Sequence, residues 1–246
     1  GDDGVIARER GFIRHRIARI AIAALASVGM LASVAACGSG QSTSEKNGTI
    51  EVAASVNQWG TVAKALGGDN VNVTSIINST NVDAHDYEPT TSDIAKLQKA
   101  QVIIVNGAGY DAWAVKAAQT ANAIIVNAAE IGGVNDGENP HVWFSADVRK
   151  AVAQAITEAY EQADAAKKSD FDKLHDQWKS EENNVESKIA EVKQKSDGLA
   201  YAATESVASY LAEDMGLADA TPSGYARATA NESEPTPTDI KQFTDA

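Results

Sequence analysis

The fold is decided by IEVAASVNQWGTVAKALGG, residues 50–68. Residues 50–55 form a short run of β-prone side chains, and residues 57–66 follow with Trp59, Leu66 and other apolar side chains at helical spacing. A pair of glycines then closes the predicted helix, because glycine is the usual residue just after a helix C-terminus. A strand that leads at once into a helix is the first half of a βαβ unit.

The same alternation continues along the chain. The sequence predicts further strands at 71–77, 101–105 and 123–127, with helices at 92–100 and 111–120. Strands that alternate with helices of this length favour a parallel sheet covered by helices. The sequence therefore predicts the α/β class for this part of the chain.

A long charged segment follows, from about residue 166 to residue 196. It contains no glycine or proline, and Phe171, Trp178, Val185 and Val192 recur at intervals of seven residues. This pattern predicts one amphipathic helix of about 45 Å. A stiff helix of this length can serve as a backbone between two lobes.

Two short sequences of the first half return in the second half in the same order. Ala-Ala-Ser at 53–55 is matched by Ala-Ala-Thr at 202–204, and EPTTSDI at 88–94 is matched by EPTPTDI at 234–240. Two echoes in one order indicate duplicated lobes. We predict two βα lobes with mainly parallel sheets, joined by the long helix, and expect the second lobe to be incomplete because the sequence stops inside a new helix.

The N-terminal segment has the features of a targeting sequence. Five arginines lie within residues 8–19, and an uncharged run rich in small and aliphatic residues extends from 20 to 36. This run is short for a transmembrane helix and fits a signal peptide. The expected parts are a signal peptide at 1–36, a lipidated tether at 37–48, an N-terminal α/β lobe at 49–164, a linking helix at 165–197 and an incomplete C-terminal α/β lobe at 198–246.

Cys37 is the only cysteine, and it ends the sequence Val-Ala-Ala-Cys. This sequence resembles the lipobox of bacterial lipoproteins, which implies cleavage before Cys37 and attachment of its thiol to lipid in the bilayer. The alternative is a buried cysteine in an apolar helix, but the Gly/Ser/Gln/Thr-rich tether that follows favours the lipoprotein. With Cys37 lipidated, no thiol remains for a disulfide or a metal site.

The charge of the chain argues against nucleic acid as a partner. The net charge is −13, and removal of residues 1–36 takes away five basic and three acidic side chains, which leaves −15. A polyanion would be repelled by such a protein. The acidic balance mildly favours cations as ligands.

Three side chains form a candidate metal site. His85 lies in DAHDYEPT at 83–90, His141 lies in NPHVW at 139–143, and Glu205 follows a predicted strand of the second lobe. Two imidazoles and a carboxylate suit a divalent metal ion. Alternatively, the histidines are hydrogen-bonded loop residues, and Glu205 is a solvated acid at a helix start.

The motifs DAHDYEPT, NGAGYDAW at 106–113 and NPHVW, in this order, resemble those of the zinc/manganese solute-binding lipoproteins of bacterial ABC transporters. In that family two lobes are joined by one long helix. The resemblance implies that His85 and His141 are ligands from the first lobe. It places Glu205 at the third-ligand position, where many zinc-binding members have histidine and manganese-binding members more often have glutamate. It implies a fourth, acidic ligand beyond Ala246.

The resemblance implies an extracytoplasmic protein, lipid-anchored to the bacterial cell membrane, that carries Mn²⁺ or Zn²⁺ as its transported ligand. Its expected partners are an ABC permease and the ATPase subunit of that transporter. We expect a monomer that is not an enzyme. Two alternatives stay open: a surface adhesin lipoprotein, and a mononuclear metalloenzyme whose two histidines and carboxylate hold Fe(II).

Overall fold

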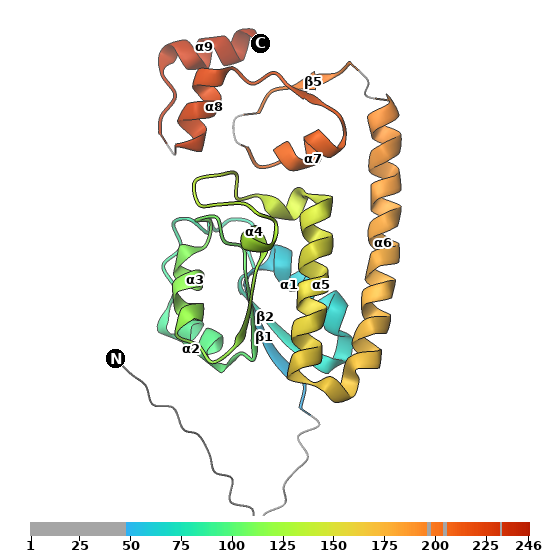
Figure 1. The fold of residues 1–246 in the computed structure, drawn as a ribbon. Helices are drawn as coiled ribbons and strands as arrows, with labels where there is room; N and C mark the ends of the chain where they lie inside the picture. Colours follow the sequence, from blue (N-terminus) through green and yellow to red (C-terminus); the bar gives the residue numbers. More distant parts are fainter. Residues whose placement is uncertain (1–47, 196–197, 204–205, 232) are drawn as a thin grey trace, which may run out of the picture. The chain divides into compact units, whose positions relative to one another are not determined.

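The computed structural model describes residues 48–195, 198–203, 206–231 and 233–246. The elements before the long helix are β1 (Ile50–Val56), α1 (Asn57–Gly67), β2 (Val71–Ile77), α2 (Thr91–Lys99), β3 (Val102–Val105), α3 (Ala112–Gln119), β4 (Ile124–Asn127), α4 (Ala128–Ile131) and α5 (Ala146–Ala163), with short 3₁₀ turns η1 (Gly68–Asn70), η2 (Val142–Phe144) and η3 (Ala165–Lys167). The long helix α6 (Lys168–Lys195) precedes β5 (Ala200–Tyr201), α7 (Ser209–Asp214), β6 (Ala218–Asp219), α8 (Ser223–Ala230) and α9 (Pro237–Asp245), as Figure 1 shows.

The first four strands form one parallel sheet. Its strand order is β2-β1-β3-β4, and Val52 of β1 pairs with Val73 on one side and with Val102 on the other. This confirms the predicted parallel α/β sheet, and each of these strands begins and ends within one residue of its predicted bounds. Because the chain passes from one side of β1 to the other between β2 and β3, the carboxyl ends of β1 and β3 lie at a topological switch point, where α/β proteins bind ligands.

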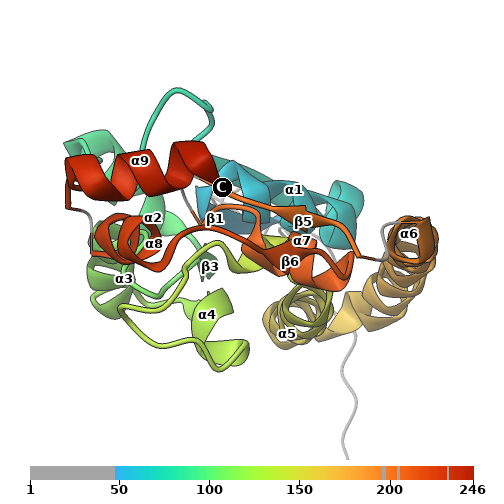
Figure 2. The same ribbon diagram turned by 90° about the horizontal axis from the view of Figure 1, so that it is seen from above.

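Helices cover both faces of this sheet (Figure 2). Val52 and Ala54 of β1 face a buried cluster that includes residues of α1, α5 and α6. Ala53, between them, faces a second cluster with residues of α2 and α3. Alternation along β1 therefore gives the sheet two buried faces, as a parallel sheet requires.

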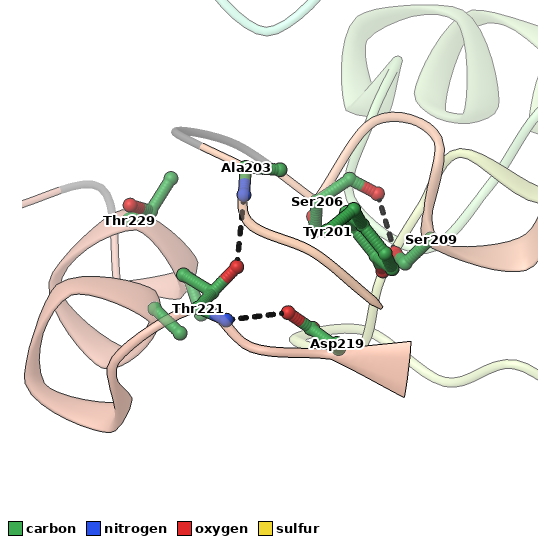
Figure 3. A pocket seen from close by; sticks show the side chains of 9 residues that line it. Tyr201, Ala203, Ser206, Ser209, Asp219, Thr221 and Thr229 are labelled. Carbon is green, nitrogen blue, oxygen red and sulfur yellow. Dashed lines mark hydrogen bonds between the residues drawn. The ribbon is translucent and has the colours of Figure 1, made fainter. Parts of the chain in front are cut away.

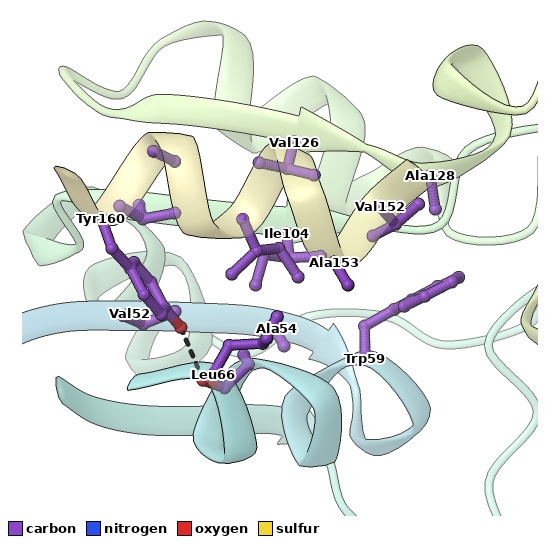
Figure 4. Packing of buried hydrophobic residues seen from close by; sticks show 14 of the residues in the cluster. Val52, Ala54, Trp59, Leu66, Ile104, Val126, Ala128, Val152, Ala153 and Tyr160 are labelled. Atoms are coloured by element: carbon purple, nitrogen blue, oxygen red, sulfur yellow. Dashed lines mark hydrogen bonds between the residues drawn. The ribbon is translucent and has the colours of Figure 1, made fainter. Parts of the chain in front are cut away.

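Figure 4 shows the larger cluster, in which side chains of β1, α1 and α5 interdigitate. Trp59, Leu66 and Tyr160 are fully buried in it. The Tyr160 hydroxyl donates a 2.8 Å hydrogen bond to the carbonyl of Ala63, so its polar atom has a partner inside the core. This contact fixes α5 against α1.

The long helix α6 confirms the predicted helix, but its predicted apolar stripe is buried over only half its length. Phe171 and Trp178 are buried, whereas Val185 and Val192 are 46% and 40% exposed. The buried half packs on α1 and α5. In the described part of the chain, no helix is both long enough and apolar enough to cross a membrane.

Beyond α6 the chain repeats the local structure of its first half. Strand β5 pairs in parallel with β6, with α7 between them in sequence, as β1 pairs with β2 around α1. Helix α7 ends at Asp214, and Gly216 closes the following turn with φ of 70°. The lobe boundaries given above stay a prediction.

The second sequence echo has a structural basis in two identical helix starts. Thr90 accepts a hydrogen bond from the backbone N–H of Asp93, whose carboxylate accepts one from the backbone N–H of Thr90, at the start of α2. Thr236 and Asp239 form the same pair of bonds at the start of α9. The repeated Thr-x-x-Asp is thus a capping box in both places.

A buried ion pair joins α5 to α6 and yields the first prediction. The side chains of Arg149 and Glu182 are only 16% and 9% exposed, and the Arg149 guanidinium also donates to the carbonyl of Trp143 at 3.1 Å. Because Glu182→Ala leaves a buried cation without its partner, we expect a loss of about 3 kcal/mol in the free energy of unfolding, measured by urea denaturation.

The control is Glu186→Ala, one turn further along α6. Glu186 pairs with Lys150 at 2.6 Å, but these side chains are 29% and 41% exposed, so the expected loss is below about 1 kcal/mol. An equal loss of unfolding free energy in the two variants would show that the buried pair Arg149–Glu182 stabilises the protein no more than the exposed pair Lys150–Glu186.

Candidate metal centre

His85 lies in the loop between β2 and α2, on the carboxyl side of the sheet. Its backbone N–H donates a 2.9 Å hydrogen bond to Asp83 Oδ1, and the indole N–H of Trp113 donates to the carbonyl of Ala84 at 3.1 Å. The preceding residue is therefore fixed to α3, while His85 itself is exposed. This exposure leaves the imidazole accessible to an ion from solvent.

His141 lies in the segment between α4 and η2 and is half-buried. The side-chain amide of Asn106 donates a 2.8 Å hydrogen bond to the carbonyl of Pro140, just before it. Arg149 donates to the carbonyl of Trp143, just after it. The backbone is thus held on both sides of the His141 imidazole.

Tyr110 brings the two predicted ligands together. Its ring centroid lies 4.9 Å from that of His85 and 6.0 Å from that of His141, with edge-on geometry in both contacts. Trp143 packs against both Tyr110 and His141. The two imidazoles, more than fifty residues apart in the sequence, therefore share one aromatic neighbour.

A buried carboxylate holds the loop that presents this tyrosine. Asp111 is fully buried, and its carboxylate accepts hydrogen bonds from the Ser55 hydroxyl, from the backbone N–H of Asn106 at 2.7 Å and from that of Gly107 at 2.9 Å. Burial raises the pKa of Asp111. The hydrogen bonds favour the charged carboxylate and lower the pKa, but their effect is smaller than that of burial. The carboxylate joins the ends of β1 and β3 at the switch point.

The turn itself has an unusual backbone. Gly107, Ala108 and Gly109 have φ of 78°, 51° and 74°, in the left-handed region. A Cβ on Gly107 would lie 2.2 Å from Asn127 Oδ1, so the position has room only for glycine. The motif NGAGYD therefore encodes a tight turn that ends with Tyr110 facing the imidazoles.

The electrostatics around His141 favour its neutral form. Burial lowers the pKa of His141, the nearby His85 lowers it further, and Asp83 opposes both effects. A neutral imidazole is the form that binds a metal ion. His141 is thus set toward the form that can ligate near neutral pH.

The third predicted ligand, Glu205, lies outside the described residues, as does Cys37. Among the residues that the structure describes, no group of three or more His, Cys, Asp or Glu side chains is placed to hold a metal ion. The three-residue ligand set therefore stays a prediction. Ser206, the next residue after Glu205, accepts a 2.9 Å hydrogen bond at its carbonyl from Asn139, so the following segment contacts the His141 loop.

Two cavities lie in the part of the chain after α6, and neither is lined by the two histidines. The smaller, of about 60 Å³, is bordered by polar groups near Ser206, where Ala203 N–H donates to Thr221 and the Ser209 hydroxyl donates to the Ser206 carbonyl (Figure 3). It has room for water or a small ion, not for an organic ligand. The larger, of about 600 Å³, is apolar and is bordered by side chains such as Leu211 and Phe243.

A parallel α/β sheet with a long helix, and two imidazoles gathered at its carboxyl edge, define an α/β protein with a candidate metal centre. The family model described as "Zinc-uptake complex component A periplasmic" matches residues 52–246. The chain belongs to this family.

Curated relatives agree with this assignment, and a solved structure shares the fold. The chain is 26% identical over 185 residues to the manganese ABC transporter substrate-binding lipoprotein PsaA of Streptococcus pneumoniae, covering 64% of this chain and 59% of the relative. It is 24% identical over 208 residues to the high-affinity zinc uptake system protein ZnuA of Bacillus subtilis, covering 75% and 65%. The crystal structure of the metal-dependent lipoprotein YcdH from Bacillus subtilis shares the fold, with a TM-score of 0.62, 24% identity and coverage of 69% and 66%.

The chain spans about half to three fifths of the length of several curated relatives that it matches. The mixed α/β fold with a parallel sheet and a long helix is confirmed.

The two imidazoles yield a prediction about pH. Protons compete with the metal for His85 and His141, so we expect the affinity for Zn²⁺ to fall as the pH is lowered from about 7.5 to about 5.5. Because the pKa of His141 is lowered, its share of the loss comes at a lower pH than for an ordinary histidine. Competition titration across this range is the measurement, and a flat affinity would contradict ligation by histidine.

The carboxylate of Asp111 yields a prediction about stability. Asp111→Asn places an amide group against three hydrogen-bond donors, so we expect a loss of about 2 kcal/mol or more in the free energy of unfolding. Asp69→Asn, at an exposed carboxylate, is the control and is expected to change stability by less than about 0.5 kcal/mol. Urea denaturation compares the two, and equal effects would show that the buried network contributes nothing.

Proposed function

We propose that this protein is the extracytoplasmic solute-binding component of a divalent-metal ABC importer, which captures Mn²⁺ or Zn²⁺ and delivers it to a membrane permease and its ATPase subunit. One observation carries the proposal: His85 and His141, from separate loops on the carboxyl side of the sheet, pack on the single ring of Tyr110. The family, and relatives named for manganese and zinc uptake, support the same function.

In this proposal His85, His141 and Glu205 are the ligands of the ion. Two imidazoles and a carboxylate offer nitrogen and oxygen atoms that both candidate metals accept. By the Irving–Williams order Zn²⁺ binds such ligands more tightly at equilibrium than Mn²⁺. Selection of manganese would therefore depend on geometry, release rate and supply.

The protein acts by binding and release, without making or breaking covalent bonds. The proposed anchor is a lipid on Cys37, which holds the protein at the outer face of the cell membrane near the permease. The relative PsaA, named a lipoprotein, supports this anchor. Adhesion, the alternative function, would persist after loss of His85 and His141, whereas metal capture would not.

Native mass spectrometry of the full chain, titrated with Mn²⁺ and with Zn²⁺, tests the proposal. We expect one bound ion per chain, and we expect His85→Ala and His141→Ala each to weaken binding at least tenfold. The matched control is His175→Ala, which removes an imidazole from the long helix α6 and is expected to retain the ion. Equal binding by all four proteins, or none by the unaltered chain, would contradict the proposal.

A further inference from the structure

Asn139 connects His141 to the segment that follows Glu205. On one side its Oδ1 lies 2.7 Å from His141 Nδ1 and accepts a 3.2 Å hydrogen bond from the His141 backbone N–H. On the other side its Nδ2 donates to the Ser206 carbonyl at 2.9 Å and to the Ser209 hydroxyl at 2.7 Å. One half-buried side chain thus joins the loop of the first sheet to the start of α7.

The orientation of this amide is set by two backbone groups. The Ser206 carbonyl can only accept a hydrogen bond, so Nδ2 must face it. The His141 backbone N–H can only donate, so Oδ1 must face that group. In a flipped amide, Oδ1 would face the Ser206 carbonyl oxygen, and the Nδ2 hydrogens would face the His141 backbone N–H. Neither pair can form a hydrogen bond, so Oδ1 is the atom beside the His141 ring.

This orientation determines the tautomer of His141. Since Asn139 Oδ1 is an acceptor without a hydrogen, Nδ1 of the ring must carry the proton, and the lone pair of a neutral imidazole is then on Nε2. Hydrogen bonding at one ring nitrogen is the usual way in which a protein directs the other nitrogen to a metal. The imidazole is thereby prepared to ligate through Nε2.

We propose that Asn139 is a positioning residue of the metal site: it holds His141 in the Nδ1–H tautomer with Nε2 available to the ion, and it ties this ligand to the chain segment adjoining Glu205. The proposal rests on the proposed function as a metal-capture protein. In this proposal the Asn139 side chain sets the tautomer of His141 and also links the His141 loop to the segment that begins at Ser206.

Neighbouring contacts restrict the movement of Asn139. The Tyr210 hydroxyl donates a 2.7 Å hydrogen bond to the Asn139 carbonyl, and the Asn106 amide donates to the carbonyl of Pro140. Both backbone carbonyls on the approach to His141 therefore have partners in other elements. The hydrogen bond of Tyr210 reaches the backbone of the same loop and not the His141 ring. Tyr210→Phe is therefore the control for Asn139→Ala.

The tautomer is tested in the full chain, without metal, by long-range ¹H–¹⁵N correlation spectra of ¹⁵N-labelled histidine at about pH 8, where an ordinary imidazole is neutral. His141→Ala assigns the signal. We expect the Nδ1–H form in the unaltered protein, in Tyr210→Phe and in Asn139→Asp, which keeps an acceptor oxygen beside Nδ1. We expect Asn139→Ala to shift the ring toward the Nε2–H form.

Zn²⁺ titration of the same proteins measures the consequence. Asn139→Ala is expected to weaken binding about 10–100-fold, and Tyr210→Phe less. An Nε2–H ring in the unaltered protein, or an unchanged tautomer in Asn139→Ala, would overturn the inference, as would loss of the Nδ1–H form in Asn139→Asp. If the unaltered chain binds no Zn²⁺, the proposed function fails, while the metal-free spectra still decide whether Asn139 sets the tautomer.

Discussion

The site depends on one buried carboxylate. Burial of Asp111 would be costly without hydrogen-bond partners, and the Ser55 hydroxyl and the backbone N–H groups of Asn106 and Gly107 supply them. These bonds draw the ends of β1 and β3 into one network and close the left-handed turn that ends at Tyr110. The aromatic ring on which both histidines pack is thus positioned by a residue that neither touches the imidazoles nor faces solvent.

The two histidines differ in how the protein holds them. His85 is exposed, whereas His141 is half-buried between hydrogen-bonded backbone carbonyls, and its ring contacts Asn139. Asn106 links this second loop to the core, because its Oδ1 accepts a 2.9 Å hydrogen bond from the Trp59 indole. A ligand already oriented before the ion arrives reduces the ordering cost of binding. In the proposed function, the exposed His85 suits the first encounter with the ion, and the oriented His141 suits its retention.

Local patterns predicted the strands of the first sheet and the helices α1, α2 and α3 to within one residue, because side-chain periodicity, glycines and caps act over a few positions. They overestimated the buried stripe of α6, where Val185 and Val192 are exposed, since a periodic sequence does not reveal where the neighbouring helices end. The roles of Asp111 and Asn139 were missed because their partners Ser55 and Ser206 lie 56 and 67 residues away. The motifs singled out His85 and His141, and the fold brings them to one ring; Glu205 stays a prediction.

In the proposed function, the imidazoles of His85 and His141 hold one divalent ion. X-ray absorption at the zinc edge, on the full chain loaded with one equivalent of Zn²⁺, identifies the atoms bound to the metal. We expect two imidazole nitrogens at about 2.0–2.1 Å together with oxygen ligands, and no sulfur. A spectrum with only oxygen neighbours, and no scattering from imidazole rings, would contradict it.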